Sequence, residues 1–155
     1  MKKNTFLLLL FFCCNNYKTI AQSKANLLCN AGWKKTSFTV YPAMQYWTNG
    51  KVESDLFKSE RACTKDDYYI YNTNGTYQLL DGEIRCMQEQ SDLVSSGKWA
   101  FQKNDSTILN ISKKNAQGLL QKKIITLTAN TFSFIYTITK NEVIYTFTET
   151  FEAIK

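Results

Sequence analysis

The segment DDYYIYNTNGTYQLLDGE, residues 66–83, contains two runs of strand-forming residues that flank Asn74 and Gly75. Asn-Gly is the pair most favoured in the two-residue turns of β-hairpins. The segment therefore predicts two antiparallel strands, 67–73 and 76–81, joined at that turn. In this register the numbers of paired residues add to 149, and Cys63 and Cys86 give the same sum. The two cysteines are thereby placed opposite each other, far from the turn, and we predict a disulfide between them.

The expected disulfide requires a local irregularity in the hairpin. In an unbroken ladder Cys63 and Cys86 would form a hydrogen-bonded pair, which is the less favourable position for a bridge. We therefore expect a bulge at Gly82 or a coil around Cys63. Closing this loop of 24 residues would stabilise the fold by about 3 kcal/mol on the chain-entropy model. Cys29 has no partner in the hairpin, and it either packs as a small buried hydrophobe or forms an intermolecular bridge.

The rest of the chain repeats short alternating runs between turn signals, at the spacing of an antiparallel meander. The connections are short enough to join neighbouring strands without crossover helices, which excludes parallel α/β folds. We predict one short helix over 53–62, between the first and second strands, with Leu56 and Phe57 on its apolar side. Eight antiparallel strands in sequence order close most simply into an up-and-down β-barrel, an all-β fold. The predicted strands are 33–41, 67–73, 76–81, 97–102, 107–112, 120–128, 131–138 and 142–152.

The amino-acid composition limits which catalytic and metal-binding sites the chain can form. The chain has 155 residues, of which 44% are hydrophobic, enough for one sizeable core. It has no histidine, so the commonest general base and the commonest metal ligand are both missing. A calcium loop around Gly75 would need an acid where Ile70 stands, and we interpret Asp66 and Asp67 as a solvated strand cap. We therefore predict a protein that is not an enzyme and has neither a cofactor nor a metal.

The first residues have the features of an export signal. Lys2 and Lys3 form a basic start, residues 6–14 form an apolar core, and Thr19 and Ala21 are small residues where a signal peptidase would act. We predict a signal peptide at 1–21, followed by one domain at 22–155.

The predicted location is therefore the periplasm or the exterior. A lipoprotein anchored through Cys14 or Cys13 is the alternative. The apolar core is too short to span a bilayer, so we expect no transmembrane segment in the mature protein.

The positive charge does not predict nucleic-acid binding. Removal of residues 1–21 takes away three lysines and no acid, which lowers the net charge from +6 to +3. Arg61 and Arg85 are the only arginines, whereas nucleic-acid binding favours an Arg-rich face with interleaved aromatic residues. Paired lysines such as Lys122 and Lys123 are interpreted as solvated edges.

The segment from Cys63 to Tyr77, followed by Cys86 and by Ser96–Phe101 (SGKWAF), resembles the bacterial lipocalin-like domains of exported proteins. The shared pattern is a Cys, a Lys-Asp-Asp, an aromatic strand, an Asn-Gly turn, a second Cys and a small-Gly-x-Trp strand. The resemblance runs from Trp33 to the end of the chain. It implies an eight-stranded barrel with a bridge between Cys63 and Cys86, and it implies no particular ligand.

Alternation along the strands predicts the barrel interior. Phe132, Phe134, Tyr136 and Ile138 share one face of their strand, and Val143, Tyr145, Phe147 and Phe151 share one face of the next. An eight-stranded barrel is either filled by such side chains or just large enough for one small molecule. We predict a small apolar or amphipathic ligand; the alternative is an envelope structural or interaction protein with a filled barrel, whose partner the sequence does not name. The predicted ligand-binding residues are Tyr69, Tyr71, Trp99, Phe101, Phe134, Tyr136, Tyr145, Phe147 and Glu149.

Glu149 is the one acidic residue predicted on an inward face, shared with Phe147 and Phe151. An unpaired carboxylate among aromatic rings would cost several kcal/mol. One interpretation is that Glu149 lies in water at a barrel mouth, or that a bulge turns it outward. The other is that Glu149 is the polar anchor of an apolar cavity. A single acid does not form the pair of carboxylates that a glycosidase needs.

Overall fold

The computed structural model describes residues 24–48, 50–87, 91–103, 105–114 and 118–154. The predicted signal peptide, 1–21, lies outside these ranges. No helix among the described residues is long and apolar enough to cross a membrane.

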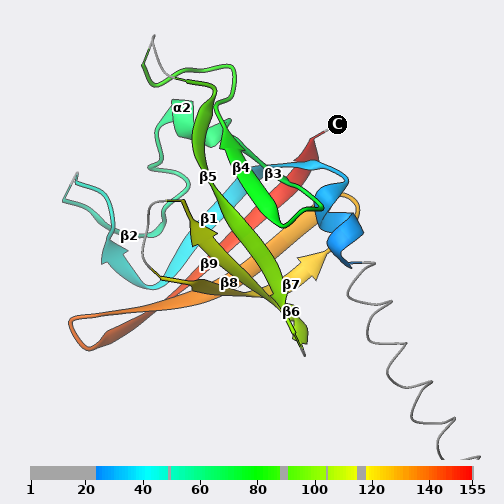
Figure 1. Ribbon diagram of the computed structural model, residues 1–155. Helices are drawn as coiled ribbons and strands as arrows, with labels where there is room; N and C mark the ends of the chain where they lie inside the picture. Colours follow the sequence, from blue (N-terminus) through cyan, green and yellow to red (C-terminus); the bar gives the residue numbers. More distant parts are fainter. Residues whose placement is uncertain (1–23, 49, 88–90, 104, 115–117, 155) are drawn as a thin grey trace, which may run out of the picture.

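The described strands form one antiparallel sheet, and eight of them close into a barrel (Figure 1). They follow one another in chain order, and the last strand pairs back with the first. This confirms the predicted up-and-down barrel. The strands are β1 (Gly32–Gln45), β2 (Val52–Asp55), β3 (Tyr68–Tyr71), β4 (Thr76–Leu80), β5 (Leu93–Gln102), β6 (Asp105–Lys113), β7 (Leu120–Leu127), β8 (Thr131–Lys140) and β9 (Val143–Ile154).

The pairing of β1 with β9 closes the barrel. It runs from Gly32 opposite Ile154 to Tyr41 opposite Thr146. The two strands that would otherwise be edges thus satisfy each other's backbone groups over most of their length, which removes the exposed edges of an open sheet.

The helix predicted over 53–62 is wrong. Val52–Asp55 instead form β2, which pairs with the end of β1 and stays outside the closed barrel. The carbonyl of Phe38 accepts hydrogen bonds from the N–H groups of Leu56 and Phe57, at 2.8 and 3.0 Å, and Leu56 is fully buried. Two adjacent apolar residues do not make the stripe that stabilises an amphipathic helix, so they pack at a turn. The helix in this connection is the single turn α2 (Ala62–Lys65).

The β3–β4 hairpin has a longer turn than predicted. Tyr71 pairs with Tyr77, and the N–H of Asn72 donates to the carbonyl of Thr76 at 2.8 Å. The N–H of Gly75 donates to the carbonyl of Asn72 at 3.0 Å, and Gly75 has a φ of 80°. A turn followed by a left-handed residue is the usual three-residue hairpin loop. The predicted register is therefore wrong by one residue.

The predicted disulfide between Cys63 and Cys86 is confirmed, with a Cα–Cα distance of 5.1 Å. Both cysteines lie outside the strands, because the ladder ends at Tyr68 and Leu80 and Cys63 belongs to α2. The bridge joins the connection before β3 to the connection after β4. Cys29 is free and half-buried, and it packs against the core.

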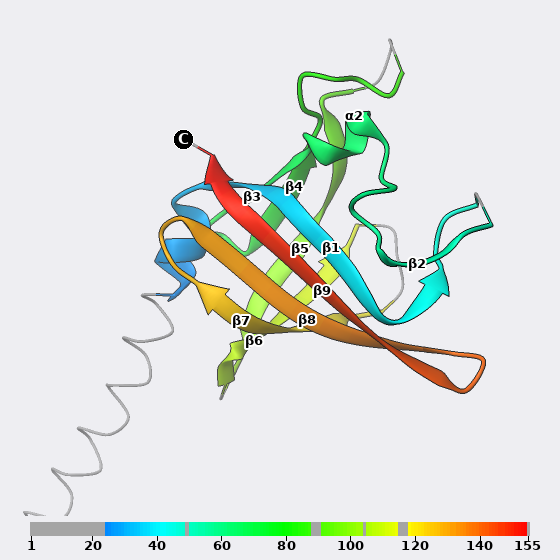
Figure 2. The ribbon, with the colours of Figure 1, turned by 180° about the vertical axis from the view of Figure 1, so that it is seen from behind.

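One end of the barrel, called here the closed end, is covered by the helical residues 24–29, drawn in blue (Figures 1 and 2). The indole N–H of Trp33 donates to the carbonyl of Leu28 at 2.8 Å, and both residues are fully buried. Aromatic and aliphatic side chains fill the barrel interior next to Leu28 and Trp33. The core comprises Leu28, Trp33, Tyr71, Tyr77, Trp99, Leu109, Ile111, Ile124, Phe132, Phe134 and Phe151.

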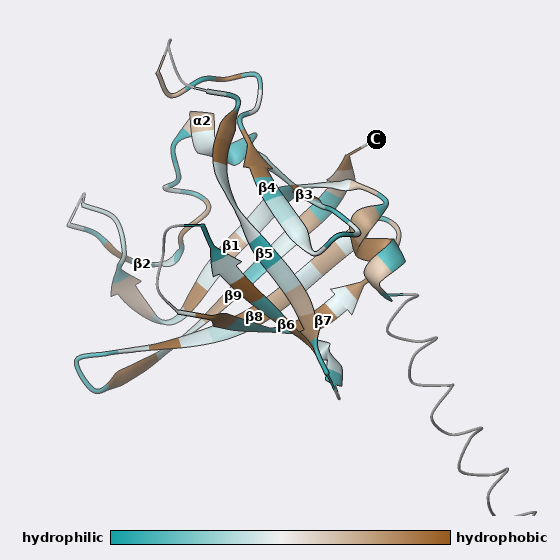
Figure 3. Cartoon of the chain, viewed as in Figure 1, coloured by the Kyte–Doolittle hydropathy of each residue, from teal (hydrophilic) through white to brown (hydrophobic). Residues whose placement is uncertain are grey.

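The opposite end, called the open end, carries the connections 46–67 and 81–92 and the hairpin between β8 and β9. This hairpin projects beyond the barrel wall as a two-stranded ribbon (Figure 2), and hydrophobic residues continue into it (Figure 3). Ile138 and Val143 are 45% and 40% exposed, so the prediction that they fill the barrel is wrong. Their alternation is as expected, but β1 pairs with β9 only as far as Thr146, and no wall faces them.

Candidate functional site

A buried ion pair lies inside the barrel. The Nζ of Lys122 on β7 is 3.5 Å from Oε1 of Glu149 on β9, and the two residues are 9% and 7% exposed. Phe134 on the intervening strand pairs with Glu149, and its ring centroid is 3.8 Å from the Lys122 ammonium. The ammonium is thus held between a carboxylate and an aromatic face, the two groups that stabilise a desolvated cation.

Burial has the larger effect on Lys122. It lowers the pKa of this lysine, and the Glu149 carboxylate acts in the opposite direction. Lys35 and Lys113 add smaller effects that also lower the pKa. The open half of the barrel therefore gathers several charged groups within electrostatic range of one another.

Several tyrosines lie within electrostatic range of the Glu149 carboxylate. Burial raises the pKa of Tyr136, and the charge of Glu149 and a hydrogen bond with it add to that effect. Burial also raises the pKa values of Tyr46 and Tyr69, and in both the Glu149 charge is the next cause. These phenols stay protonated, and Tyr136 donates its hydrogen bond to the carboxylate.

A second ion pair joins β1 to the connection between β2 and α2. The Nζ of Lys35 is 2.6 Å from Oε1 of Glu60, and both side chains are largely buried. The other carboxylate oxygen of Glu60 is buried without a hydrogen-bond partner. Beside this pair is a hollow of about 230 Å³, lined by Lys35, Glu60, Thr64, Asp67, Tyr69, Leu79 and Val94.

Asp67 and Asp81 are buried carboxyl groups at the edge of this region, each 8% exposed. Burial raises the pKa of Asp67 to about 6, the backbone N–H of Gly82 opposes the shift, and Asp81 and Asp66 add to it. The interpretation of Asp67 as a solvated strand cap is therefore wrong. Its carboxyl group lies beneath the chain at Gly82 instead.

The predicted ligand-binding residues fall into three groups. Tyr71, Trp99, Phe101 and Phe134 belong to the ring-filled core of the closed end, where Tyr71 and Trp99 have centroids 5.9 Å apart. Phe147 and Tyr145 pack in a smaller cluster with Phe38 and Leu56. The remaining three reach polar groups in the open half: Tyr69, Tyr136 and Glu149.

Glu149 is buried rather than in water at a barrel mouth, and no bulge turns it outward. It pairs with Phe38 on one side and with Phe134 on the other. The ion pair with Lys122 supplies the compensation that a buried carboxylate requires.

Sequence reasoning missed Lys122, Lys35 and Glu60. Lys122 was expected on a solvated edge, yet it is two residues from the buried Ile124, and this alternation marks it as inward. Lys35 shares the inward face with Phe38 because the register of β1 shifts between Lys35 and Ser37. This bulge at Thr36 breaks the alternation, so the sequence carries no simple signal for it. Glu60 lies in an irregular connection and carries no signal either.

Comparisons with known proteins identify no family for this chain. No family model matches the chain. No curated protein matches it. One similar solved structure is a complex of bovine odorant binding protein with a selenium-containing odorant, at 13% sequence identity and a TM-score of 0.47, covering 84% of this chain and 73% of that chain. This likeness carries no argument about family or ligand.

Proposed function

We propose that this chain is an exported lipocalin-like protein that binds a small amphipathic molecule in the open half of its barrel. The observation that carries the proposal is the buried pair of Lys122 and Glu149. A buried ion pair seldom adds net stability over well-packed apolar residues. Binding sites, in contrast, commonly place a few polar groups in an apolar wall to orient a ligand.

The polar part of the ligand would meet Glu149, Tyr136 and Lys122. A hydroxyl or amine can donate to the carboxylate, and a carbonyl can accept from the ammonium or the phenol. The hollow beside Lys35 and Glu60 has a volume of about 230 Å³, which suits a small ligand rather than a long lipid; Tyr69 lines it, whereas Glu149, Tyr136 and Lys122 do not. The other predicted contacts would serve as the rigid apolar wall.

Export is part of the proposal. The disulfide between Cys63 and Cys86 is typical of an oxidising compartment such as the periplasm or the exterior. The basic and apolar start of the sequence agrees with this.

Native mass spectrometry of the protein purified from its own envelope tests the proposal. A co-purified small molecule is the expected result, and a bare chain contradicts the proposal. Glu149→Gln and Tyr136→Phe should each weaken binding of that molecule about tenfold or more, the loss expected when one hydrogen bond to a charged group is removed. Matched controls are Glu152→Gln, at an exposed position of the same strand, and Tyr41→Phe, an exposed tyrosine on β1. Both controls should bind as the wild type does.

A second candidate is an envelope interaction protein with a filled barrel. The ring-filled closed end and the exposed Ile138, Val143 and Ile144 of the projecting hairpin favour it. A bare chain in the same mass spectra would support this candidate. Substituting threonine at these three positions would then weaken association with the partner without lowering the thermal midpoint.

A further inference from the structure

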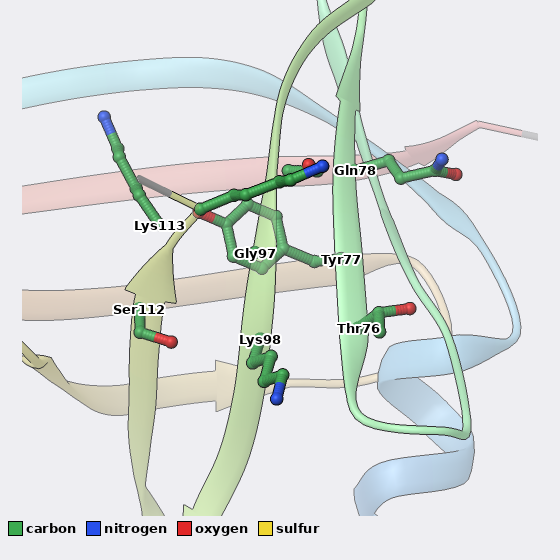
Figure 4. Close-up of a pocket in the computed structure, with 9 residues that line it drawn as sticks. Thr76, Tyr77, Gln78, Gly97, Lys98, Ser112 and Lys113 are labelled. Carbon is green, nitrogen blue, oxygen red and sulfur yellow. The ribbon is translucent and has the colours of Figure 1, made fainter. Parts of the chain in front are cut away.

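A second hollow lies on the barrel wall formed by β4, β5 and β6, away from the pair of Lys122 and Glu149. Its volume is about 500 Å³, and Figure 4 shows its lining residues on these three strands. The register places Thr76, Lys98 and Ser112 side by side in one row. The next outward row holds Gln78, Ser96 and Lys114, because Gln78 pairs with Ser96 and the N–H of Lys114 donates to the carbonyl of Ser96 at 2.8 Å. These six residues alternate with buried ones such as Tyr77, Trp99 and Ile111, so they face outward.

Gly97 lies between the two rows and keeps the wall thin. A Cβ added there would be 2.0 Å from the carbonyl oxygen of Ser112 and 2.7 Å from Cε1 of Tyr77. The position therefore accepts no side chain. The ring of Tyr77 backs the wall at Gly97, and it is 3% exposed. The floor of the hollow is thus a rigid backbone surface that the core supports.

The lining is strongly positive. Lys98, Lys113 and Lys114 all line the hollow, and no acidic residue does. None of these three lysines forms an ion pair with a described carboxylate. Three like charges around one hollow repel each other, and an anion placed between them removes that cost.

The uncharged lining residues add donors. Ser96 and Ser112 carry hydroxyl groups that can donate to an anion. Neighbouring strands are about 4.8 Å apart, so side chains from adjacent strands can reach one tetrahedral group together. Lysine ammonium groups bind phosphate as point charges and need no bidentate geometry.

We propose that this hollow binds the phosphate or sulphate group of a small molecule or headgroup. The ammonium groups of Lys98, Lys113 and Lys114 neutralise the oxyanion, and the hydroxyls of Ser96 and Ser112 donate to its oxygens. This site does not depend on the proposed function of the barrel interior; Lys113 alone acts on both, because its charge also lowers the pKa of Lys122.

Calorimetric titration of the full-length oxidised protein with inorganic phosphate and with sulphate, at constant ionic strength, tests the site. The triple variant Lys98→Gln/Lys113→Gln/Lys114→Gln should weaken saturable binding at least tenfold. The matched control is Lys103→Gln/Lys123→Gln/Lys140→Gln, which removes the same charge from three exposed positions on other parts of the surface. It should bind as the wild type does. An equal loss in both variants, or the absence of saturable binding, overturns the proposal.

Two further probes identify the source of the oxyanion. If the wild type binds glycerol 3-phosphate and the triple variant at Lys98, Lys113 and Lys114 does not, the ligand is a soluble molecule. If the wild type binds only phosphatidylglycerol vesicles, the ligand is a lipid headgroup. Either result supports the site. If neither glycerol 3-phosphate nor the vesicles bind, the proposal is overturned. Glu149→Gln should bind phosphate normally, so failure of the barrel ligand and failure of this site are told apart.

Discussion

Lys122 and Glu149 lie on strands that are separated by β8, and their side chains meet inside the barrel with 3.5 Å between Nζ and Oε1. Each charge offsets the free-energy cost of burying the other. Removing either one leaves a charge among aromatic rings, so the energetic role of the pair is best measured one partner at a time.

Lys122→Met and Glu149→Gln should each lower the free energy of unfolding by about 3 kcal/mol, because a buried charge then lacks its partner. The double variant should recover most of the loss. Urea denaturation of the wild type, the two single variants and the double variant measures these free energies of unfolding. Additive losses in the double variant would show that the two side chains do not interact.

Loss of the disulfide should be costly. Replacing Cys63 and Cys86 by serine should lower the free energy of unfolding by about 3 kcal/mol, because the unfolded chain gains the freedom of the opened loop. Reduction with dithiothreitol should have the same effect on the wild type. Cys29→Ser, which touches no bridge, is the control and should remain within about 1 kcal/mol of the wild type.

The stability of the protein should fall as the pH rises through the range set by Asp67. Its folded pKa of about 6 lies above the ordinary aspartate pKa of 3.8. The folded state therefore holds this proton more tightly than the unfolded state, and the contribution is complete below pH 4 and lost above pH 6. Thermal midpoints measured between pH 4 and 7.5 should show a decline that Asp67→Asn reduces. Asp55→Asn, at an exposed position, should leave the decline unchanged.

Gly97→Ala should destabilise the barrel wall by about 1–3 kcal/mol, the usual cost of forcing extra atoms into a packed site. The added methyl would overlap the carbonyl oxygen of Ser112 and the ring of Tyr77. Ser96→Ala, at the adjacent outward position, adds no atom and is the control. Equal thermal midpoints for both variants would mean that the wall yields without strain.

The fold was predictable because the alternation of polar and apolar residues is a local property. Phe132 and Phe134, or Phe147 and Phe151, show their inward face in the sequence itself, and turns such as Asn74-Gly75 separate the strands. The hairpin register was not predictable, because Asn72–Thr76 accommodates either a two-residue or a three-residue loop. The choice depends on Asn74, which lacks the positive φ that a two-residue type I′ turn requires. The prediction of a helix over 53–62 was wrong for a similar reason, since the backbone hydrogen bonds of Leu56 and Phe57 go to Phe38, a residue distant in sequence.

The candidate site was only partly predictable. Glu149 was found by alternation, but its partner was not, because a lysine in a Lys-Lys pair has no local sign of burial. Lys122 becomes inward only when the wall around it is assembled. Glu60 comes from a turn, and its meeting with Lys35 is a tertiary contact.

The bulge at Thr36 shifts the inward–outward alternation of the side chains of β1 by one residue. Before it the odd-numbered Trp33 and Lys35 point inward, and after it the even-numbered Phe38 and Val40 do so. Deletion of Thr36 would remove the bulge and leave a regular strand in which Lys35 and Phe38 still point inward, whereas deletion of Thr39 would turn Val40 outward. The two aromatic clusters and the ion pair thus tolerate loss of the residue at the bulge but not of one beyond it, and the bulge is the position where β1 can lose a single residue.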